Sequence, residues 1–287
     1  MRIDREWTGA LHDSAGVVTR ERFFDAAGVP VRYVDEGAGV PVVLVHCFGG
    51  DFDSQFLATG IFPALVQAHR VLGMDLRGHG RSGKPRDPRA YGAQLTLDIV
   101  RLLDHAGVER AHVVGYSMGA HLVAQLLTLA PGRMLSATLG GACGRLHWTR
   151  EDDVRVAAEA SELEQGSMRA QILRLWPAGR PLPREEEIAA RSRRYLAGQD
   201  ALALAAMRRA NRDQVVSEAA LAAVDVPTLG IVGSRDPYLT QFQSLVGCMR
   251  TLQLVIIDGA AHADAAAHPQ FAAALRAFLA AHAGEGG

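Results

Sequence analysis

A serine flanked by two glycines is the most constraining feature of this chain, in the segment Gly115-Tyr116-Ser117-Met118-Gly119. An apolar, β-branched run precedes the segment, and an apolar run with helical spacing follows it. We therefore expect a tight strand-to-helix turn, in which a Cβ at either glycine would press against a neighbouring strand or helix. Such a turn presents the serine hydroxyl at a sheet edge and the Met118 N–H at a helix N-terminus, where an oxyanion is stabilised. The motif predicts a nucleophilic serine.

The rest of the chain alternates short β-rich runs with amphipathic helical runs, a pattern typical of a mostly parallel sheet covered by helices. The first two strands are expected to form a hairpin. Strands are predicted at residues 22–25, 31–35, 41–46, 71–75, 111–115, 135–139, 228–232 and 252–257, and helices at 61–68, 95–106, 120–130 and 269–282.

Residues 144–219 break this alternation, because they are dense in Arg, Glu, Ala and Leu and contain no convincing strand. A gap of about 75 residues is too long for an ordinary connection within a compact sheet, so it should hold helices of its own. We predict that residues 144–219 form a helical cap over a core made of residues 1–143 and 220–287. Its apolar side chains either line a pocket or merely seal the cap against the core; these are Trp148, Ile172, Leu173, Leu175 and Trp176.

Composition excludes several classes of function. The 287 residues include 30 Lys+Arg and 31 Asp+Glu, so the charge balance predicts neither nucleic acid nor an anionic membrane as a partner. Cys47, Cys143 and Cys248 are too few and too scattered for a disulfide framework or a metal knuckle. The first residues, 1–7, lack the apolar stretch of a signal peptide, and no run is long enough to cross a bilayer. A cytoplasmic location is expected.

A base and an acid for the serine follow it in the sequence. A serine hydroxyl is a poor nucleophile until a base accepts its proton and a third group orients that base. Asp236 follows the strand at 228–232, and His262 follows the strand at 252–257. Both therefore lie at carboxyl ends of strands, where open α/β sheets place their sites. Asp258, at the end of the last strand, is the rival candidate for the acid.

On these motifs the chain resembles the capped enzymes of the α/β-hydrolase fold, from about residue 22 to residue 282. The resemblance implies an α/β fold with a mostly parallel, eight-stranded sheet flanked by helices and an inserted helical cap. It implies that Ser117 is the nucleophile, Asp236 the orienting acid and His262 the general base. No metal or organic cofactor is implied.

The loop after the third strand departs from the family pattern. The family commonly has His-Gly-x-Pro-Gly or His-Gly-x-x-Gly there, whereas this chain has His46-Cys47-Phe48-Gly49-Gly50. The resemblance implies that the backbone N–H of Phe48 joins that of Met118 to bind the oxyanion. Cys47 puts a side chain beside a tight turn, so the geometry of the oxyanion hole is open. Its thiol is either inert packing or a functional, redox-sensitive group.

Substrate contacts are expected from Cys47 in this loop and from His147, Trp148 and Trp176 in the cap. The segment 74–82 resembles the family's turn after the fourth strand, and this resemblance implies that Asp75 and Arg77 are structural and that Ser82 helps to close the loop. It likewise implies structural roles for His46 and His79, and His121 is expected to pack.

The sequence predicts a serine hydrolase that cleaves a carboxylic ester or lactone of a small to medium acyl substrate through an acyl-enzyme. Carbon–carbon hydrolases of ring-cleavage products share this triad, but they generally carry a tryptophan just after the histidine, where Ala263 stands here. Perhydrolase chemistry on the same triad is a further alternative. A weakly catalytic ligand-binding protein on the same fold is the alternative from another class, favoured by the changed oxyanion loop. The expected partner is a small molecule, and a homodimer is possible.

Overall fold

The computed structural model describes residues 10–12 and 18–283. The N-terminal residues 1–7, on which the expectation about a signal peptide rests, lie outside the described residues. Within the described part, no helix combines the length and apolar character that crossing a bilayer requires.

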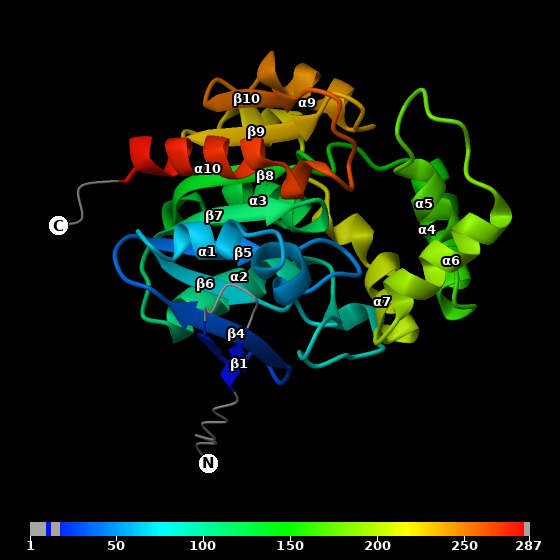
Figure 1. The fold of residues 1–287 in the computed structure, drawn as a ribbon, viewed down its shortest axis with the longest axis horizontal. Helices are drawn as coiled ribbons and strands as arrows, with labels where there is room; N and C mark the ends of the chain where they lie inside the picture. The colour runs from blue at the N-terminus through cyan, green and yellow to red at the C-terminus, as the bar shows by residue number, and fades with distance from the viewer. Residues whose placement is uncertain (1–9, 13–17, 284–287) are drawn as a thin grey trace.

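An eight-stranded, mostly parallel sheet forms the centre of the molecule, with the strand order β10-β9-β8-β7-β5-β6-β4-β3 (Figure 1). β3 and β4 form the predicted antiparallel hairpin, and β4 is also antiparallel to β6. The predicted α/β fold and its eight strands are confirmed. The strands are β3 (Arg22–Asp25), β4 (Pro30–Glu36), β5 (Pro41–Val45), β6 (Arg70–Met74), β7 (Ala111–Tyr116), β8 (Met134–Gly140), β9 (Thr228–Gly233) and β10 (Leu252–Ile257). A separate two-stranded sheet, β1 (Ala10–His12) and β2 (Val18–Arg20), was not predicted.

Helices cover both faces of the sheet. Successive side chains of a strand point to opposite faces, so β5 sends Val43 and Val45 into one apolar cluster and Val42 and Leu44 into another. The first cluster lies under α2 (Ala93–His105), α3 (Met118–Leu129) and α9 (Leu239–Val246). The second lies under α1 (Ile61–Leu65) and α10 (Pro269–Ala281). Short helical turns complete these layers: η1 (Asp53–Leu57), η2 (Pro88–Ala90), η3 (Pro131–Arg133) and η5 (Ala265–Ala267).

The segment between β8 and β9 is helical, as expected, and we propose that its residues 144–219 form the cap. Thr149 and Asp152 form a capping box that satisfies backbone N–H groups at the start of α4. In Figure 1 the helices α4 to α7 stand to one side of the sheet. The helices of this segment are α4 (Arg150–Glu164), α5 (Arg169–Arg174), α6 (Glu185–Leu196), α7 (Ala201–Arg209), η4 (Asn211–Gln214) and α8 (Glu218–Ala222).

Candidate active site

Ser117 lies at the turn from β7 to α3 with φ 53° and ψ −109°, a backbone conformation that non-glycine residues rarely adopt. The flanking glycines make this turn possible. A Cβ at Gly115 would overlap the backbone of Gly119, and one at Gly119 would overlap the carbonyl oxygen of Val45 in β5. The close approach of helix and strand that the motif predicts is therefore present, and it is the local reason for two glycines at this spacing.

Ser117, Asp236 and His262 come together from three loops at the carboxyl ends of the strands. His262 Nε2 lies 2.9 Å from Ser117 Oγ, and its Nδ1 lies 2.8 Å from Asp236 Oδ2. A carboxylate only accepts hydrogen bonds, so Nδ1 carries the proton and the Nε2 lone pair faces the serine. The other oxygen of Asp236 accepts from the Tyr238 N–H at 2.9 Å. This arrangement fits a base oriented by a buried acid.

Asp258, the rival acid, makes a different contact. It is exposed and accepts a hydrogen bond from Ser234 Oγ at 3.2 Å, whereas Asp236 is buried against His262.

Phe48 and Met118 have free backbone N–H groups beside this arrangement, with no acceptor in the described part of the chain. Met118 is the first residue of α3, where N–H groups lack helical partners. Phe48 belongs to the loop after β5, and its neighbour Gly49 donates to His79 Nε2 at 3.0 Å. Two unpaired donors of this kind are what an oxyanion hole requires.

His46 and His79 brace the loop. His46 Nδ1 donates to the Cys47 carbonyl at 2.7 Å, and its Nε2 accepts from the Leu76 N–H at 2.9 Å. Burial lowers the pKa of both imidazoles, so both rings are neutral and can accept a backbone hydrogen bond. Both residues therefore play the supporting role that was expected of them.

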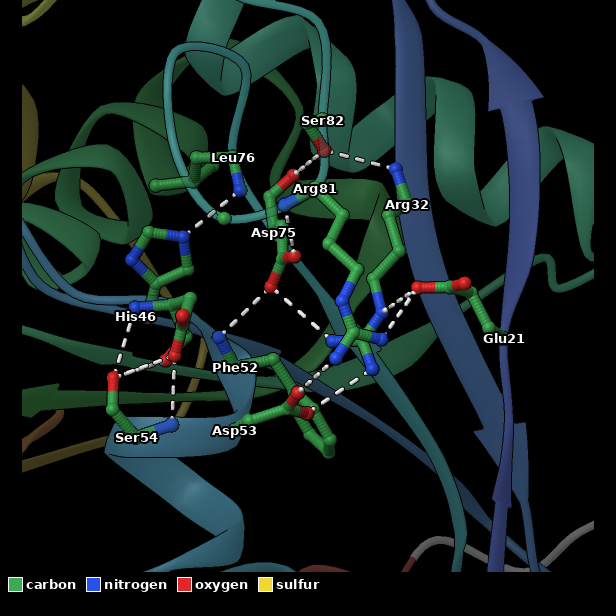
Figure 2. A network of polar contacts seen from close by, with 12 residues as sticks. Glu21, Arg32, His46, Phe52, Asp53, Ser54, Asp75, Leu76, Arg81 and Ser82 are labelled. Atoms are coloured by element: carbon green, nitrogen blue, oxygen red, sulfur yellow. Dashed lines mark hydrogen bonds and ion pairs between the residues drawn. The ribbon is translucent and has the colours of Figure 1, made fainter. Parts of the chain in front are cut away.

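A buried polar network holds the segment that follows the loop (Figure 2). Asp75 Oδ1 accepts from the Phe52 N–H at 2.9 Å and from Arg32 Nη1 at 3.3 Å. Asp75 Oδ2 accepts from the Arg81 N–H at 2.9 Å. Ser82 Oγ donates to the Asp75 carbonyl at 2.6 Å and accepts from the Arg32 N–H at 2.9 Å, which closes the loop after β6 as predicted.

Cys47 takes an ordinary backbone conformation, since the positive φ in this loop falls on Gly49 at 74°. The side chain at position 47 therefore introduces no backbone strain. Burial raises the pKa of its thiol to about 12, so the thiol is protonated at neutral pH. A thiolate is the reactive form of cysteine, and this environment disfavours it.

Two further residues expected to be structural are buried. Arg77 donates from Nε to Asp98 Oδ2 at 2.6 Å, and from Nη2 to the Ala26 carbonyl at 2.9 Å. His121 lies one helical turn after Ser117, and its ring centroid is 5.7 Å from that of Tyr238. Burial lowers the pKa of His121 far below its usual value, which fits a packing role.

A cavity of about 330 Å³ opens beside Ser117 between the core and the helices of residues 144–219. Its size is at the lower end of small-molecule sites. Two of the residues predicted to contact substrate, Cys47 and Trp176, line this cavity. The lining residues are Cys47, Phe48, Ser54, Gln55, Thr59, Tyr116, Ser117, Met168, Gln171, Ile172, Leu175, Trp176, Pro177, Arg180, Arg191, Tyr195, Ala261, His262, Ala263, Asp264, Ala266 and Ala267.

His147 and Trp148 do not line this cavity, contrary to expectation. The indole N–H of Trp148 donates to Asp153 Oδ1 at 2.7 Å, which holds the ring at the start of α4. The His147 side chain is 71% exposed, with its Nε2 3.4 Å from Glu218. Their position in the sequence places them at the entrance to the cap, but the local contacts of α4 and α8 turn both side chains to other partners.

Arg208 and Glu159 form a buried cluster above the loop that sequence reasoning missed. The Arg208 guanidinium lies 4.0 Å from the centre of the Phe48 ring and donates to Gln171, which lines the cavity. Its Nε is 3.1 Å from Glu159, which also pairs with Arg174 at 3.2 Å. Burial alone would raise the pKa of Glu159, but the neighbouring arginines hold it below its usual value. These residues come from different helices, so no short motif announces the cluster.

Comparison with known proteins identifies the family of this chain. The family model described as the alpha/beta hydrolase fold matches residues 40–172. RutD of Pseudomonas savastanoi, named as a carbamate hydrolase, is 31% identical over 216 residues, which cover 70% of this chain and 79% of that protein. The chain belongs to the α/β-hydrolase fold family. The match includes the turn that carries Ser117.

Other relatives of this α/β hydrolase share less of its length. The dihydrolipoyllysine-residue acetyltransferase component of an acetoin cleaving system from Cupriavidus necator is 42% identical over 119 residues, 41% of this chain and 31% of that protein. The chain spans between 31% and 54% of the first curated relatives it matches. The enol-lactonase structure from Burkholderia xenovorans shares the fold, with a TM-score of 0.73 and 23% identity over 90% of this chain and all of that one.

No metal site emerges from the part of the chain that the structure describes. Across residues 10–12 and 18–283, no three or more His, Cys, Asp or Glu side chains are grouped so that they could hold a metal ion.

Proposed function

We propose that this α/β hydrolase is a serine hydrolase that cleaves a carboxylic ester or lactone of a small to medium acyl substrate. The contact between His262 Nε2 and Ser117 Oγ, 2.9 Å long and beside a cavity, carries this proposal. A relative named as a carbamate hydrolase and a structural neighbour named as an enol-lactonase are consistent with attack on a carbonyl carbon.

In the first half of the reaction, Ser117 Oγ attacks the carbonyl carbon of the substrate and His262 Nε2 takes the hydroxyl proton. The imidazolium that forms is stabilised by the Asp236 carboxylate at Nδ1. The carbonyl oxygen becomes an oxyanion, which the N–H groups of Phe48 and Met118 bind. As the tetrahedral intermediate collapses, His262 returns the proton to the leaving alcohol oxygen, and the acyl group stays on Ser117.

In the second half, a water molecule replaces the alcohol. His262 Nε2 accepts a proton from this water as its oxygen attacks the acyl carbon, and the same N–H groups bind the second oxyanion. Collapse breaks the bond to Ser117 Oγ, which recovers its proton from His262. The acid product leaves the site and the enzyme returns to its starting state.

The test is a series of 4-nitrophenyl esters from acetate to palmitate, assayed with the wild-type protein and with Ser117→Ala. We expect turnover that peaks at short or medium acyl chains and falls about a thousandfold or more in the variant. Circular dichroism of the variant checks that the fold is intact. Turnover that survives in Ser117→Ala would show that the serine mechanism is wrong.

Failure on every ester would favour the other candidates. The same two proteins are then assayed with a ring-cleavage product for carbon–carbon cleavage and with acetate and hydrogen peroxide for peracid formation. If none of these reactions depends on Ser117, the remaining interpretation is a ligand-binding protein on the hydrolase fold.

A further inference from the structure

Two arginine side chains pack against the ring of Trp176, in the cavity wall that residues 144–219 form. The guanidinium of Arg180 lies 5.2 Å from the centre of the Trp176 ring, and that of Arg191 lies 5.1 Å from it. All three residues line the cavity that contains Ser117. The indole N–H donates to the Pro181 carbonyl at 2.9 Å, which fixes the ring against which both arginines rest. The arrangement positions two cations by cation–π contacts.

Neither arginine is neutralised by the protein. Within residues 10–12 and 18–283, no carboxylate lies within 4.0 Å of Arg180 or Arg191, and neither guanidinium donates a hydrogen bond. Arginines nearby behave differently, because Arg169 pairs with Glu185 at 2.8 Å and Arg184 is 3.8 Å from Glu187. Arg180 and Arg191 therefore present free donors in the cavity wall.

The cavity is asymmetric in charge. Its one carboxylate among the described lining residues is Asp264, which comes from the core two residues after His262. The opposite wall carries Arg180 and Arg191. A neutral hydrocarbon placed against this wall would cover charged groups without compensating them, whereas a carboxylate would pair with them, and a guanidinium matches a carboxylate in geometry.

We propose that the substrate carries a carboxylate besides the bond that is cleaved, and that Arg180 and Arg191 bind it. The preferred substrate class is then a half-ester of a dicarboxylic acid or a lactone with a carboxylate substituent. This inference rests on the proposed function, because it concerns the substrate of the same site. It assigns binding to the wall formed by residues 144–219 and the chemistry to the core wall.

The experiment compares two esters of equal chain length that differ only at the far end of the acyl group, 4-nitrophenyl hexanoate and the mono-4-nitrophenyl ester of adipic acid. We expect the double variant Arg180→Gln/Arg191→Gln to lose about tenfold or more in kcat/KM on the adipate half-ester, mainly through KM. Turnover of the hexanoate should change by less than about twofold, since that ester presents no charge to the arginines. Added salt should weaken only the half-ester reaction.

Arg194→Gln is the matched control, because Arg194 is an exposed arginine on the same helix as Arg191 but does not line the cavity. It should leave both esters unchanged. The double variant Arg180→Lys/Arg191→Lys keeps the charge and should recover part of the half-ester activity. Equal losses on both esters, or no loss on the half-ester, would overturn the proposal.

A binding measurement separates this inference from the proposed function. Titration calorimetry of the adipate half-ester is carried out on Ser117→Ala, with and without the two arginine substitutions. Binding that depends on the arginines supports the carboxylate site even if no ester is hydrolysed. Arginine-independent binding, or none, refutes the site even if hexanoate turnover establishes the hydrolase.

Discussion

The two walls of the cavity are built under different constraints. On the core side, Ser117 and His262 are positioned by strand ends and by glycines that leave no room for a Cβ. On the side formed by residues 144–219, Trp176 and two exposed arginines are positioned by one another and by a loop between helices. The comparison shows that the reacting groups depend on backbone geometry, whereas the groups that face the rest of the substrate depend on side-chain contacts.

The walls meet at Phe48. Its backbone N–H is one of the proposed oxyanion donors, and its ring lies under the Arg208 guanidinium. Arg208 in turn pairs with the buried Glu159. A change in the cluster of Glu159 and its arginines can therefore reach the loop beside Ser117 through the Phe48 side chain.

The largest effect should come from the core wall. His262→Ala removes the base and should lower ester turnover at least about ten-thousandfold, because the serine loses its proton acceptor. His147→Ala, at the cap entrance and away from the cavity, should stay within about twofold. Steady-state kinetics on both variants tests this contrast, and similar losses in the two would break it.

The next largest loss of activity should come from replacing Asp236, and replacing Asp258 should have little effect. Asp236→Asn should lower kcat about a thousandfold or more, since an amide favours the wrong tautomer of the imidazole. Asp258→Asn should change it less than about threefold, because that side chain is exposed and bound to Ser234. A larger loss in Asp258→Asn than in Asp236→Asn would reverse the assignment of the acid.

The free energy of unfolding should also distinguish the turn from β7 to α3 from an ordinary turn that contains glycine. Gly119→Ala drives a Cβ into the carbonyl of Val45 and should lower the free energy of unfolding by about 4 kcal/mol or more. Gly132→Ala is the matched control, because nothing lies within 4 Å of its added Cβ. Urea denaturation of both variants measures the difference, and a mild effect in Gly119→Ala would contradict the close packing of α3 on β5.

Glu159→Gln tests how far the cluster of Glu159 and its arginines supports the core wall. Removing this carboxylate leaves the buried Arg208 without its counter-charge, which should lower the free energy of unfolding by about 3 kcal/mol. Activity should fall as well, because Arg208 no longer holds the Phe48 ring in place. Glu186→Gln, an exposed change on α6, serves as the control. Thermal and urea unfolding, together with ester kinetics, give both readouts.

The smallest effect on activity is expected at Cys47, whose effect on stability depends on pH. Below about pH 9 the thiol is protonated in both the folded and the unfolded chain, so Cys47→Ala should leave activity within about threefold. Between about pH 9 and 12 only the unfolded chain ionises, because the folded pKa is raised to about 12. Each pH unit then lowers the free energy of unfolding by up to about 1.4 kcal/mol. Denaturation in alkaline buffers should show a shallower decline of stability with pH in Cys47→Ala, and identical slopes would contradict the raised pKa of the thiol.

Much of the core was predictable because its residues are constrained by local geometry. The spacing of Gly115, Ser117 and Gly119 describes a turn that few other sequences allow, and the strands before Asp236 and His262 place both at one sheet edge. The same reasoning missed α9 and the small β1–β2 sheet, whose short segments carry weak periodicity.

The sequence by itself determined the fold class and the helical nature of residues 144–219, and it predicted Ser117, Asp236 and His262 from the strand before each, because these signals depend on near neighbours in the chain. That the three side chains meet, with Asp236 and not Asp258 at the imidazole, is a long-range contact. Only the tertiary structure decided which side chains of that segment face Ser117. It directs Trp148 to Asp153, brings Arg180 and Arg191 to Trp176, and lays Arg208 on Phe48. Those contacts join residues from separate helices and loops, and side chains on an amphipathic surface carry no local signal of the partner they will meet.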